Sequence, residues 1–413
     1  MFVQTSEELL SDRSKALIET IVANIPGLNK TRRQFMAHIL VLMLAVPGRR
    51  TILNLSRWAD YCEKTIRLHF GQLFDWQVFN TELVRQTGRD VIIAFDPFYL
   101  PKSGKKTYGL SRFWSGVAGA VLPGIEFSAF ALIDTMAKTA LHYRAFQTPD
   151  RKELLDKGIN LLQHYGNLVA QEGANLRKIS RFFVADAYFS KKPFIEKVLT
   201  ADLDFIGKMR KDVSLRYLYT GPKTGKKGAP KKFDGKVNPT DLRKKYFLRT
   251  KIEDAVLYSG KLNVKAWGAE MQVVFVFSAD EESLGAILFT TADDLPAETI
   301  VNYYRLRFQI EFLYRDAKQF AGMTHCQSRS KEALDFHINA SLTGVSVAKV
   351  AKYYEQKPEP TDKRPAFSLA DIRNRLINEM RLKTFIFMFE IPANTQINQD
   401  KIRELLRKGQ IAA

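Results

Sequence analysis

Three acidic residues, far apart along the chain, are of a type that can hold metal ions against a phosphate group. Asp96 ends the apolar run RDVIIAFD, and Asp186 follows the apolar run RFFVA. Glu311 lies within YYRLRFQIEFLYRDAKQFAG, residues 303–322, among several Arg and Lys residues. Carboxylate oxygens are the protein ligands that Mg²⁺ prefers. Two such ions can activate a water or a 3′-hydroxyl and stabilise the leaving oxygen of a phosphodiester.

The positions of Asp96 and Asp186 favour a shared cleft. Each follows four or five apolar residues, a pattern typical of a buried strand. Ligands of open α/β sheets bind where such strands end. The alternative is that each aspartate only caps a turn, which either residue taken alone would also fit.

The segment around Glu311 reads as one amphipathic helix. With about 100° per residue, five residues share a stripe about 80° wide: Tyr304, Arg307, Glu311, Arg315 and Lys318. The buried face is predicted to hold the apolar residues Leu306, Ile310, Leu313 and Ala317.

This charged stripe has two interpretations. As a solvated face it would hold ion pairs of Glu311 with Arg307 and Arg315, each contributing a few tenths of a kcal/mol. That interpretation does not explain why Phe308 and Phe312 flank the stripe. If Glu311 instead binds metal, the cations of the stripe are placed to hold phosphates.

The elements that must position these residues indicate an α/β core. Strands, a helix, a strand and further helix follow one another between residues 90 and 200. FWSGVAGAVLPGIEFSAFALID, residues 113–134, reads as two strands that meet around Pro123 and Gly124. Residues 1–85 read as helical, and two short helices with a break near Cys62 and Glu63 resemble a helix-turn-helix. The second would present Thr65, Arg67 and His69 to DNA, helped by Lys30, Arg32, Arg33, Arg49 and Arg50.

The charge of the chain points to a polyanionic partner. The 413 residues include 63 Lys and Arg against 44 Asp and Glu, a net charge of +19, and 46% are hydrophobic. Residues 208–251 alone hold 15 Lys and Arg against three Asp. Within them TGPKTGKKGAPKKFDGK, which includes Lys226 and Lys227, is predicted to be a basic loop that contacts phosphates, or else a solvated linker.

Other classes of site are weakly supported. The two cysteines, Cys62 and Cys326, give no disulfide framework, which suits a reducing cytoplasm. The longest apolar run, residues 39–46, is about half of a membrane span, and the N-terminus lacks a signal-peptide pattern. His325, Cys326 and His337 could form a metal site, but His337 more simply packs or contacts DNA. No segment satisfies the phosphate-loop pattern, so no nucleotide cofactor is expected.

Four of these residues also carry a resemblance to a known family. Tyr304, Arg307, Glu311 and Lys318 fit Y-x2-R-x3-E-x6-K, which resembles the signature of bacterial insertion-sequence DDE transposases. The segments around Asp96 and Asp186 resemble those with the first and second catalytic aspartates of that family. The resemblance covers residues 90–345 well and the N-terminal helices loosely.

The resemblance implies an RNase H-like catalytic core with a strand-rich insertion, an N-terminal helical DNA-binding domain and a helical C-terminal region. The predicted segments are residues 1–85 (DNA-binding helices), 86–200 (first part of the core), 201–294 (insertion with the basic loop), 295–356 (last core helices) and 357–413 (C-terminal helices).

The resemblance also implies an activity. A transposase of this kind binds the terminal repeats of its insertion sequence, cuts them as a metal-dependent endonuclease and joins them to target DNA. Asp96, Asp186 and Glu311 would hold two Mg²⁺, with Mn²⁺ able to substitute. In a branch of the family that forms DNA hairpins, aromatic residues handle a flipped base, and Phe308 and Trp267 are the candidates. Trp267 is equally well read as a buried strand residue.

The expected partners are double-stranded DNA and a second copy of the chain, in a prokaryotic cytoplasm at the nucleoid, with no membrane. Two alternatives stay open from the residues: a structure-specific nuclease that cuts without joining, and a catalytically silent DNA-binding repressor of transposition.

Overall fold

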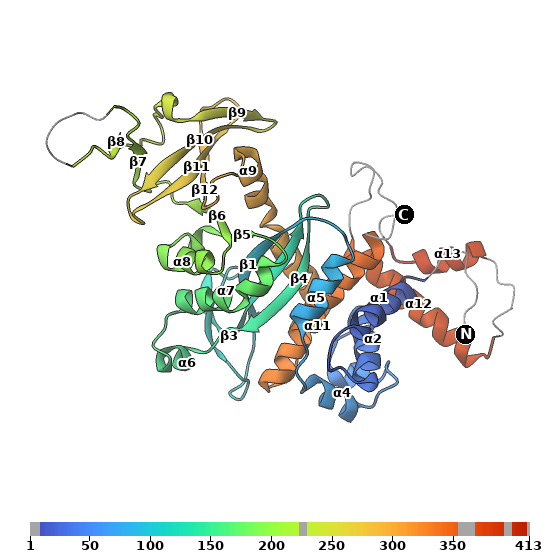
Figure 1. Cartoon of the computed structure of the whole chain (residues 1–413). Helices are drawn as coiled ribbons and strands as arrows, with labels where there is room; N and C mark the ends of the chain where they lie inside the picture. Colours follow the sequence, from blue (N-terminus) through green and yellow to red (C-terminus); the bar gives the residue numbers. More distant parts are fainter. Residues whose placement is uncertain (1–8, 223–228, 354–367, 392–398, 411–413) are drawn as a thin grey trace. The chain divides into compact units, whose positions relative to one another are not determined.

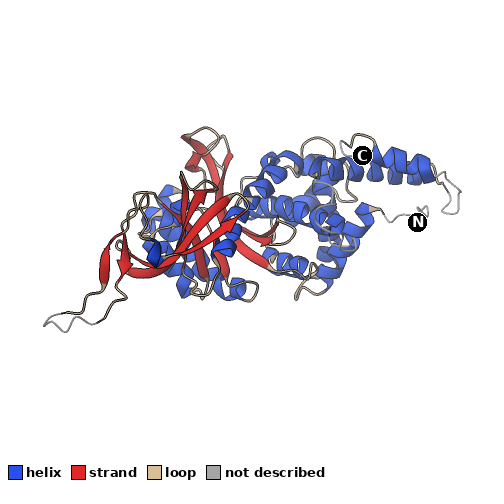
Figure 2. Ribbon diagram, turned by 90° about the horizontal axis from the view of Figure 1, so that it is seen from above, coloured by secondary structure: helices blue, strands red, loops and turns tan. Residues whose placement is uncertain are grey.

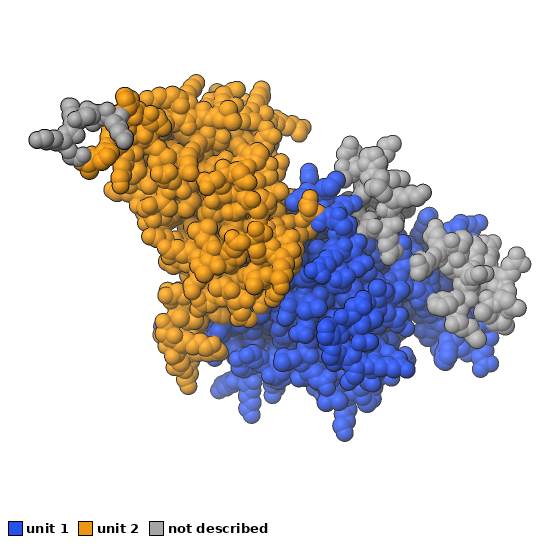
Figure 3. Space-filling model, in the orientation of Figure 1, with its two compact units in different colours: residues 1–89, 97–151, 310–413 blue, residues 90–96, 152–309 orange. Residues whose placement is uncertain are grey.

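A computed structural model describes residues 9–222, 229–353, 368–391 and 399–410 (Figure 1). The chain divides into two compact units (Figure 3). Unit 1 contains residues 1–89, 97–151 and 310–413, and unit 2 contains residues 90–96 and 152–309. The division does not follow the order of the predicted segments, because the N-terminal helices fold together with residues from the middle and the end of the chain.

Helices form most of unit 1 and are drawn in blue in Figure 2. The N-terminal helices are α1 (Leu10–Ala23), α2 (Lys30–Ala45), α3 (Ile52–Ser56), α4 (Glu63–Phe70) and α5 (Trp76–Arg85). The later elements are α10 (Gln309–Phe320, of which Gln309 belongs to unit 2), η3 (Met323–His325), α11 (Lys331–Tyr353), α12 (Leu369–Met388) and α13 (Gln399–Arg407). Asn29 and Thr51 cap α2 and α3 by accepting backbone N–H bonds, as these residue types commonly do.

The strands of unit 1 are the second half of β1 (Val91–Pro101), β2 (Ser111–Ser115), β3 (Ala120–Asp134) and β4 (Thr139–Gln147). β3 pairs antiparallel with both β2 and β4. The prediction of a break at Pro123 and Gly124 is wrong, because β3 continues through both residues. Pro123 lies on the part of β3 paired with β2, and its carbonyl accepts a bond from the Tyr99 hydroxyl at 2.6 Å. Only glycine fits at position 124, where a Cβ would lie 2.4 Å from the Leu100 carbonyl oxygen.

α11 is the central helix of unit 1, and its buried polar side chains bond the backbone of β4. Asn339 accepts from the Ala145 N–H at 2.9 Å and donates to the Ala145 carbonyl at 3.1 Å. Ser346 accepts from the His142 N–H at 2.7 Å, and Lys349 donates to the Ala140 carbonyl at 2.9 Å. A strand edge presents unpaired backbone groups whose burial is unfavourable. The buried polar side chains of α11 therefore satisfy backbone groups along this edge of β4.

Unit 2 is built on parallel strands that helices cover. The first half of β1 pairs with β5 (Phe182–Val184), which pairs with β6 (Asp204–Met209), all in parallel. The helices between them are α6 (Arg151–Asp156), α7 (Leu161–Arg177), η1 (Ala187–Phe189) and α8 (Lys192–Thr200). α7 begins with a capping box in which Asn160 and Gln163 bond each other's backbone N–H. α7 and α8 pack side by side (Figure 1).

An antiparallel meander extends the sheet of unit 2 beyond β6. β12 (Leu284–Thr290) pairs with β6, β11 (Ala269–Ser278) with β12, and β10 (Ala255–Val264) with β11. β7 (Leu215–Leu218) and β9 (Leu248–Ile252) pair with β10, β8 (Phe233–Lys236) pairs with β7, and η2 covers Lys244–Tyr246. These strands lie in the segment predicted to be a strand-rich insertion.

The predicted single helix over residues 303–322 is wrong, because the structure has two. α9 (Ala297–Leu306) ends before Arg307 and Phe308, and α10 begins at Gln309. The Arg307 and Phe308 N–H groups bond carbonyls three residues back, each at 3.3 Å, instead of four. These shorter-range bonds replace the α-helical hydrogen bonds at Arg307. Such local 3₁₀ geometry within a helix often marks a functional hinge.

The N-terminal helices correct a further prediction, that His69 faces DNA. Ile66 and Phe70 face inward, and His69 is buried as well. The His69 ring stacks on Phe35 with centroids 4.0 Å apart, and its carbonyl accepts from Arg32 at 2.7 Å. Arg32 is itself buried, so Arg32 and His69 hold α2 and α4 together and do not face DNA.

Glu379 of α12 takes the place of an N-cap for α1, and its removal tests how strongly the two helices depend on each other. Its carboxylate is fully buried, accepts from the Leu10 and Ser11 N–H groups at 3.0 and 2.7 Å and pairs with Arg375 at 3.0 Å. We expect Glu379→Ala to lower the free energy of unfolding by about 3 kcal/mol, since two helix N–H groups and a cation lose their partner.

Urea unfolding followed by circular dichroism measures this change. Glu404→Ala on α13 removes an exposed glutamate and is the matched control, with an expected effect within about 0.5 kcal/mol. Equal midpoints for the two variants would show that Glu379 does not hold α1.

Candidate active site

The parallel pairing of β1 and β5 brings Asp96 and Asp186 to the same level of the sheet in unit 2. The register pairs Ile93 with Phe183 and Ala94 with Val184. Asp186 lies two residues beyond the end of β5, and Asp96 lies two residues beyond Ala94 on β1. Extending the register by these two residues sets Asp96 level with Asp186. Paired residues project from the same face of a sheet, so both carboxylates project from one face. Both side chains are half-buried.

The opposite face is filled by an aromatic core. Phe95 precedes Asp96 and therefore points the other way. Its ring lies 6.3 Å from that of Phe183, 5.8 Å from Tyr165 of α7 and 6.1 Å from Phe194 of α8. Because these rings are buried, the alternation along β1 places Asp96, which lies within this strand, on the side away from the aromatic core.

α9 lies on the face that carries the two aspartates. Phe182, which shares a face with Val184 and Asp186, contacts Tyr303 of α9 with ring centroids 5.3 Å apart. Tyr304, the next residue of α9, is close enough to Asp186 to interact with it electrostatically. The Arg307 guanidinium lies 6.0 Å from the centre of the Tyr304 ring. The first two signature residues and one catalytic candidate are thus grouped in unit 2.

The pKa of Tyr304 reflects this grouping. Burial raises the pKa of the Tyr304 phenol, Arg307 lowers it, and the negative charge of Asp186 raises it further. The raised pKa keeps the phenol protonated at neutral pH. Tyr304 can therefore donate a hydrogen bond to a phosphate oxygen beside Asp186.

Asp186 fits both interpretations that the sequence left open, a turn-capping aspartate and a metal ligand. Its Oδ1 accepts the Tyr188 N–H at 2.8 Å and so caps η1, the short helix that follows β5. That bond fixes the carboxylate at the strand end while engaging one of its two oxygens. A capping role and a metal-binding role are therefore compatible for this residue.

The last two signature residues lie on α10 in unit 1. The predicted buried face is confirmed, since Leu306, Ile310, Leu313 and Ala317 are buried. Tyr314 packs on Phe98 of β1 with centroids 4.5 Å apart, and the Lys318 ammonium lies 5.9 Å from the Phe98 ring. The helix that carries half-buried Glu311 therefore rests on the part of β1 that begins directly after Asp96.

Two cations near Glu311 in the sequence pair with other carboxylates. Arg315 pairs with its neighbour Asp316 at 3.1 Å and lies over Phe312, with its guanidinium carbon 4.7 Å from the ring centre. Arg305 pairs with Asp254, in the turn between β9 and β10, at 2.8 Å. Both interpretations of the charged stripe remain compatible with these pairs.

The donor set suits a divalent metal, although no complete site is formed among the described residues. Two carboxylates in register on one face provide the oxygen ligands that Mg²⁺ prefers. In the described part of the chain, no three His, Cys, Asp or Glu side chains are grouped so that they could hold a metal ion. Asp96 and Asp186 belong to unit 2 and Glu311 to unit 1, and their convergence stays a prediction.

The alternative metal site at His325, Cys326 and His337 is not supported. His325 Nδ1 accepts the Arg50 N–H at 3.1 Å, and burial, reinforced by Arg50 and Arg49, lowers the pKa of His325 to about 4. His337 is buried and donates from Nε2 to the Gly322 carbonyl at 2.8 Å. Both imidazoles therefore serve as structural hydrogen-bonding groups.

Two predicted DNA-contacting residues are accessible on the surface. Phe308 is 45% exposed at the junction of α9 and α10. Arg67 is exposed on α4 and bonds Glu63 from Nε at 2.9 Å. Their contact with DNA stays a prediction. Lys226 and Lys227 lie outside the described residues.

Trp267 lies in the turn between β10 and β11 and not within a strand. Its ring packs on Phe289 with centroids 4.9 Å apart. The sheet register places Lys208 of β6, and through β12 Val274 of β11, level with Asp186. The Trp267 turn precedes β11, where Ala269 pairs with Val264 of β10. The contact with Phe289 indicates a packing role, and a contact of Trp267 with DNA stays a prediction.

The electrostatic influence of Asp186 on Tyr304 can be tested without a substrate. Asp186→Asn removes a negative charge that raises the pKa of Tyr304, so we expect this pKa to fall while the effect of burial remains. NMR of ¹³Cζ-labelled tyrosines over alkaline pH measures it, with Tyr304→Phe assigning the signal.

Asp202→Asn neutralises an exposed carboxylate of the same unit and should leave the Tyr304 signal unchanged. Position 202 has a φ of 56°, a left-handed conformation that asparagine also adopts readily. If Asp186→Asn behaved like this control, Tyr304 and Asp186 would not be neighbours.

The comparisons with known proteins agree with this geometry. The family model for a transposase DDE domain matches residues 130–343. The matched range contains Asp186, Glu311 and the whole signature but begins after Asp96, whose assignment rests on its pairing with β5. No curated protein matches the chain significantly.

Members of this family act on DNA in transposition and generally use divalent metals. Among the described residues, no helix combines the length and apolar character that crossing a membrane requires. The match spans more than half of the chain and contains Asp186 and the signature residues, and the chain therefore belongs to the family of DDE transposases.

Proposed function

We propose that this transposase cuts the ends of its own insertion sequence by metal-dependent hydrolysis and joins the freed 3′ ends to target DNA. The observation that carries the proposal is the parallel pairing of β1 with β5, whose register, extended by two residues, sets Asp96 level with Asp186. The charge of Asp186 also raises the pKa of Tyr304 on α9. Glu311 is proposed as the third carboxylate, because it holds the glutamate position of the signature within the matched family range.

The strand order supports an RNase H-like core for this activity. β1, β5 and β6 are parallel, and β3 and β4 form an antiparallel pair that follows β1 in the chain. The strand ends of such a core offer carboxylates to a phosphodiester. α9 reaches these ends from the meander, and α10 rests on the second half of β1.

Each residue has a defined task in the proposed site. Asp96, Asp186 and Glu311 would hold two Mg²⁺, which when bound activate the attacking water or 3′-hydroxyl and stabilise the leaving oxygen. Tyr304 donates a hydrogen bond to a phosphate oxygen, and Arg307 supplies positive charge beside it. Lys318, on the same helix as Glu311, provides a second cation for the DNA backbone.

The exposed ring of Phe308 completes the proposal. An aromatic face beside a backbone-binding groove can stack on an unpaired base, a contact that contributes about 1–3 kcal/mol. Phe308 follows Arg307 directly at the helix junction, so a base extruded near the cut would find the ring beside the phosphate-binding cation. We propose that the active assembly is at least a dimer, since two ends must be cut and joined.

Conservative substitution of the three carboxylates tests the catalytic proposal. We expect Asp96→Asn, Asp186→Asn and Glu311→Gln each to reduce Mg²⁺-dependent nicking of a duplex that carries the terminal repeat by on the order of 10³-fold. DNA binding should persist, because the substitutions remove negative charge. Nicking is followed by denaturing electrophoresis, and binding by fluorescence anisotropy.

Asp202→Asn and Glu332→Gln alter exposed carboxylates outside the site and should nick as the unaltered protein does. Normal nicking by Glu311→Gln would remove Glu311 from the site. A pre-cut end offered with target DNA separates a transposase, which joins the two, from a structure-specific nuclease. A complete absence of nicking by the unaltered protein would favour the DNA-binding repressor.

A further inference from the structure

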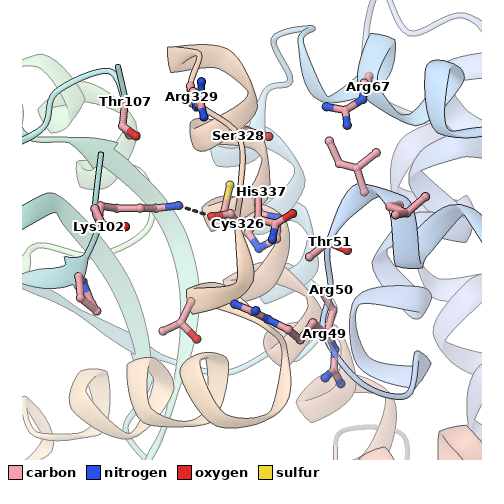
Figure 4. Close-up of a pocket in the computed structure, with 16 residues that line it drawn as sticks. Arg49, Arg50, Thr51, Arg67, Lys102, Thr107, Cys326, Ser328, Arg329 and His337 are labelled. Carbon is pink, nitrogen blue, oxygen red and sulfur yellow. Dashed lines mark hydrogen bonds between the residues drawn. The ribbon is translucent and has the colours of Figure 1, made fainter. Parts of the chain in front are cut away.

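Unit 1 contains a pocket that has no role in the proposed chemistry. The pocket, of about 790 Å³, is lined by three segments of unit 1 (Figure 4). The first runs from Arg49 to Leu53 with Arg67 of α4, the second is the loop after β1, and the third leads from η3 into α11. None of the proposed metal-binding or signature residues lines this pocket.

Hydrogen bonds hold the three segments together around the pocket. Buried Arg50 donates to the Met43 and Phe320 carbonyls at 3.1 and 2.8 Å, and so joins the loop after α2 to the end of α10. Lys102 donates to the Cys326 carbonyl, as Figure 4 shows. The walls are therefore positioned before any ligand binds, which reduces the entropy lost on binding.

A glycine allows the closest approach at this junction. Gly322 has a φ of 71°, a left-handed conformation that favours glycine. A Cβ at this position would lie 2.7 Å from the Arg50 side chain. The Tyr108 N–H also bonds the Arg329 carbonyl at 2.9 Å, which ties the loop after β1 to the third segment.

The charge of the pocket is entirely positive. Its lining residues include Arg49, Arg67, Lys102 and Arg329 besides Arg50, and no Asp or Glu. Arg49 and Arg329 are exposed, and neither forms an ion pair within the described part of the chain. Arg67 is held only by an exposed pair with Glu63, which contributes about 0.3–0.5 kcal/mol and yields readily to a stronger anion.

The other lining residues define the anion further. Hydroxyl groups line the pocket and can donate to phosphate oxygens: Thr51, Ser103, Thr107, Thr324 and Ser328. No Phe, Tyr or Trp is among the lining residues, and the imidazole of His337 is buried and bonds the Gly322 carbonyl, so the pocket offers no exposed ring on which a base could stack. The volume matches the roughly 300–1,000 Å³ of small-ligand sites, which admits backbone groups of one strand but not a duplex.

We propose that this basic pocket anchors backbone phosphates of one DNA strand, away from the chemistry of cutting. The inference rests on the proposed function, because it takes the DNA of the transposition reaction as the source of the phosphate. A guanidinium group can bind two phosphate oxygens at once. The two exposed arginines, Arg49 and Arg329, line the pocket from separate segments. The anchor would fix the register of the DNA without reading its sequence.

Neutralising the two exposed arginines tests the anchor. Arg49→Gln and Arg329→Gln are compared with Arg85→Gln, which removes the same charge from an exposed arginine of α5 in the same unit. Affinity for a labelled duplex is measured by fluorescence anisotropy without Mg²⁺, over a range of salt concentrations. Each lost phosphate contact lowers the salt slope of the binding constant by about 0.9.

We expect Arg49→Gln and Arg329→Gln each to weaken binding several-fold and to reduce the slope by about one, and the double variant by about two. Arg85→Gln should change neither quantity. Equal affinities and slopes for the pocket variants and Arg85→Gln would overturn the anchor.

Inorganic phosphate distinguishes a free anion from DNA as the ligand. If phosphate raised the melting temperature of the unaltered protein but not of the double variant, while DNA affinity stayed equal, the pocket would be a free-anion site and the proposal would fall. Failure of the proposed function has a different signature, namely no Mg²⁺-dependent nicking by the unaltered protein. Nicking with unchanged pocket variants would overturn the anchor alone.

Discussion

The parallel pairing of β1 with β5 is the constraint on which the proposed chemistry depends. Its register sets Asp96 level with Asp186, and the alternation of side chains sends both carboxylates to one face. A shift of one residue in either strand would turn its aspartate into the aromatic core of Phe95, Phe183 and Tyr165. The tight packing of that core therefore protects the geometry of the acidic pair.

Buried polar contacts fix the helical surroundings in the same way. Asn339, Ser346 and Lys349 satisfy the backbone of β4, and Arg50 joins the loop after α2 to the end of α10. Each of these groups would be unfavourable to bury without its partner. Their joint satisfaction specifies a single arrangement of unit 1, in which Arg49 and Arg329 remain exposed at the basic pocket.

The positive charge of the chain thus has several distinct uses. Arg32 and Arg50 are buried and structural, and burial lowers the pKa of each to about 10. Arg305 and Arg315 are paired with Asp254 and Asp316. Arg32 and Arg50 therefore count toward the net charge of +19 without being available to phosphate, which makes the positions of the cations more informative than their number.

The sequence by itself determined the family and the buried face of the signature helix. Each of these depends on residue types at fixed short spacings, which local geometry imposes directly. The sequence also singled out Asp96 and Asp186, but the prediction that Asp96 ends a strand is wrong, because β1 continues from Val91 to Pro101. β4 is not evident from the sequence, because the polar residues His142 and Arg144 interrupt its strand pattern. The polar side chains of α11 that make their burial favourable lie some 200 residues further along the chain.

Only the tertiary structure decided which cations are free to meet DNA, where the signature helix breaks and which face the aspartates share. Arg32 and His69 look like surface residues on a helical wheel, yet their mutual contact buries them. No proline or glycine marks the break at Arg307 and Phe308 in the sequence. The helices on either side of the break, α9 and α10, belong to different units. Such properties arise from contacts between segments far apart in sequence, which no local pattern encodes.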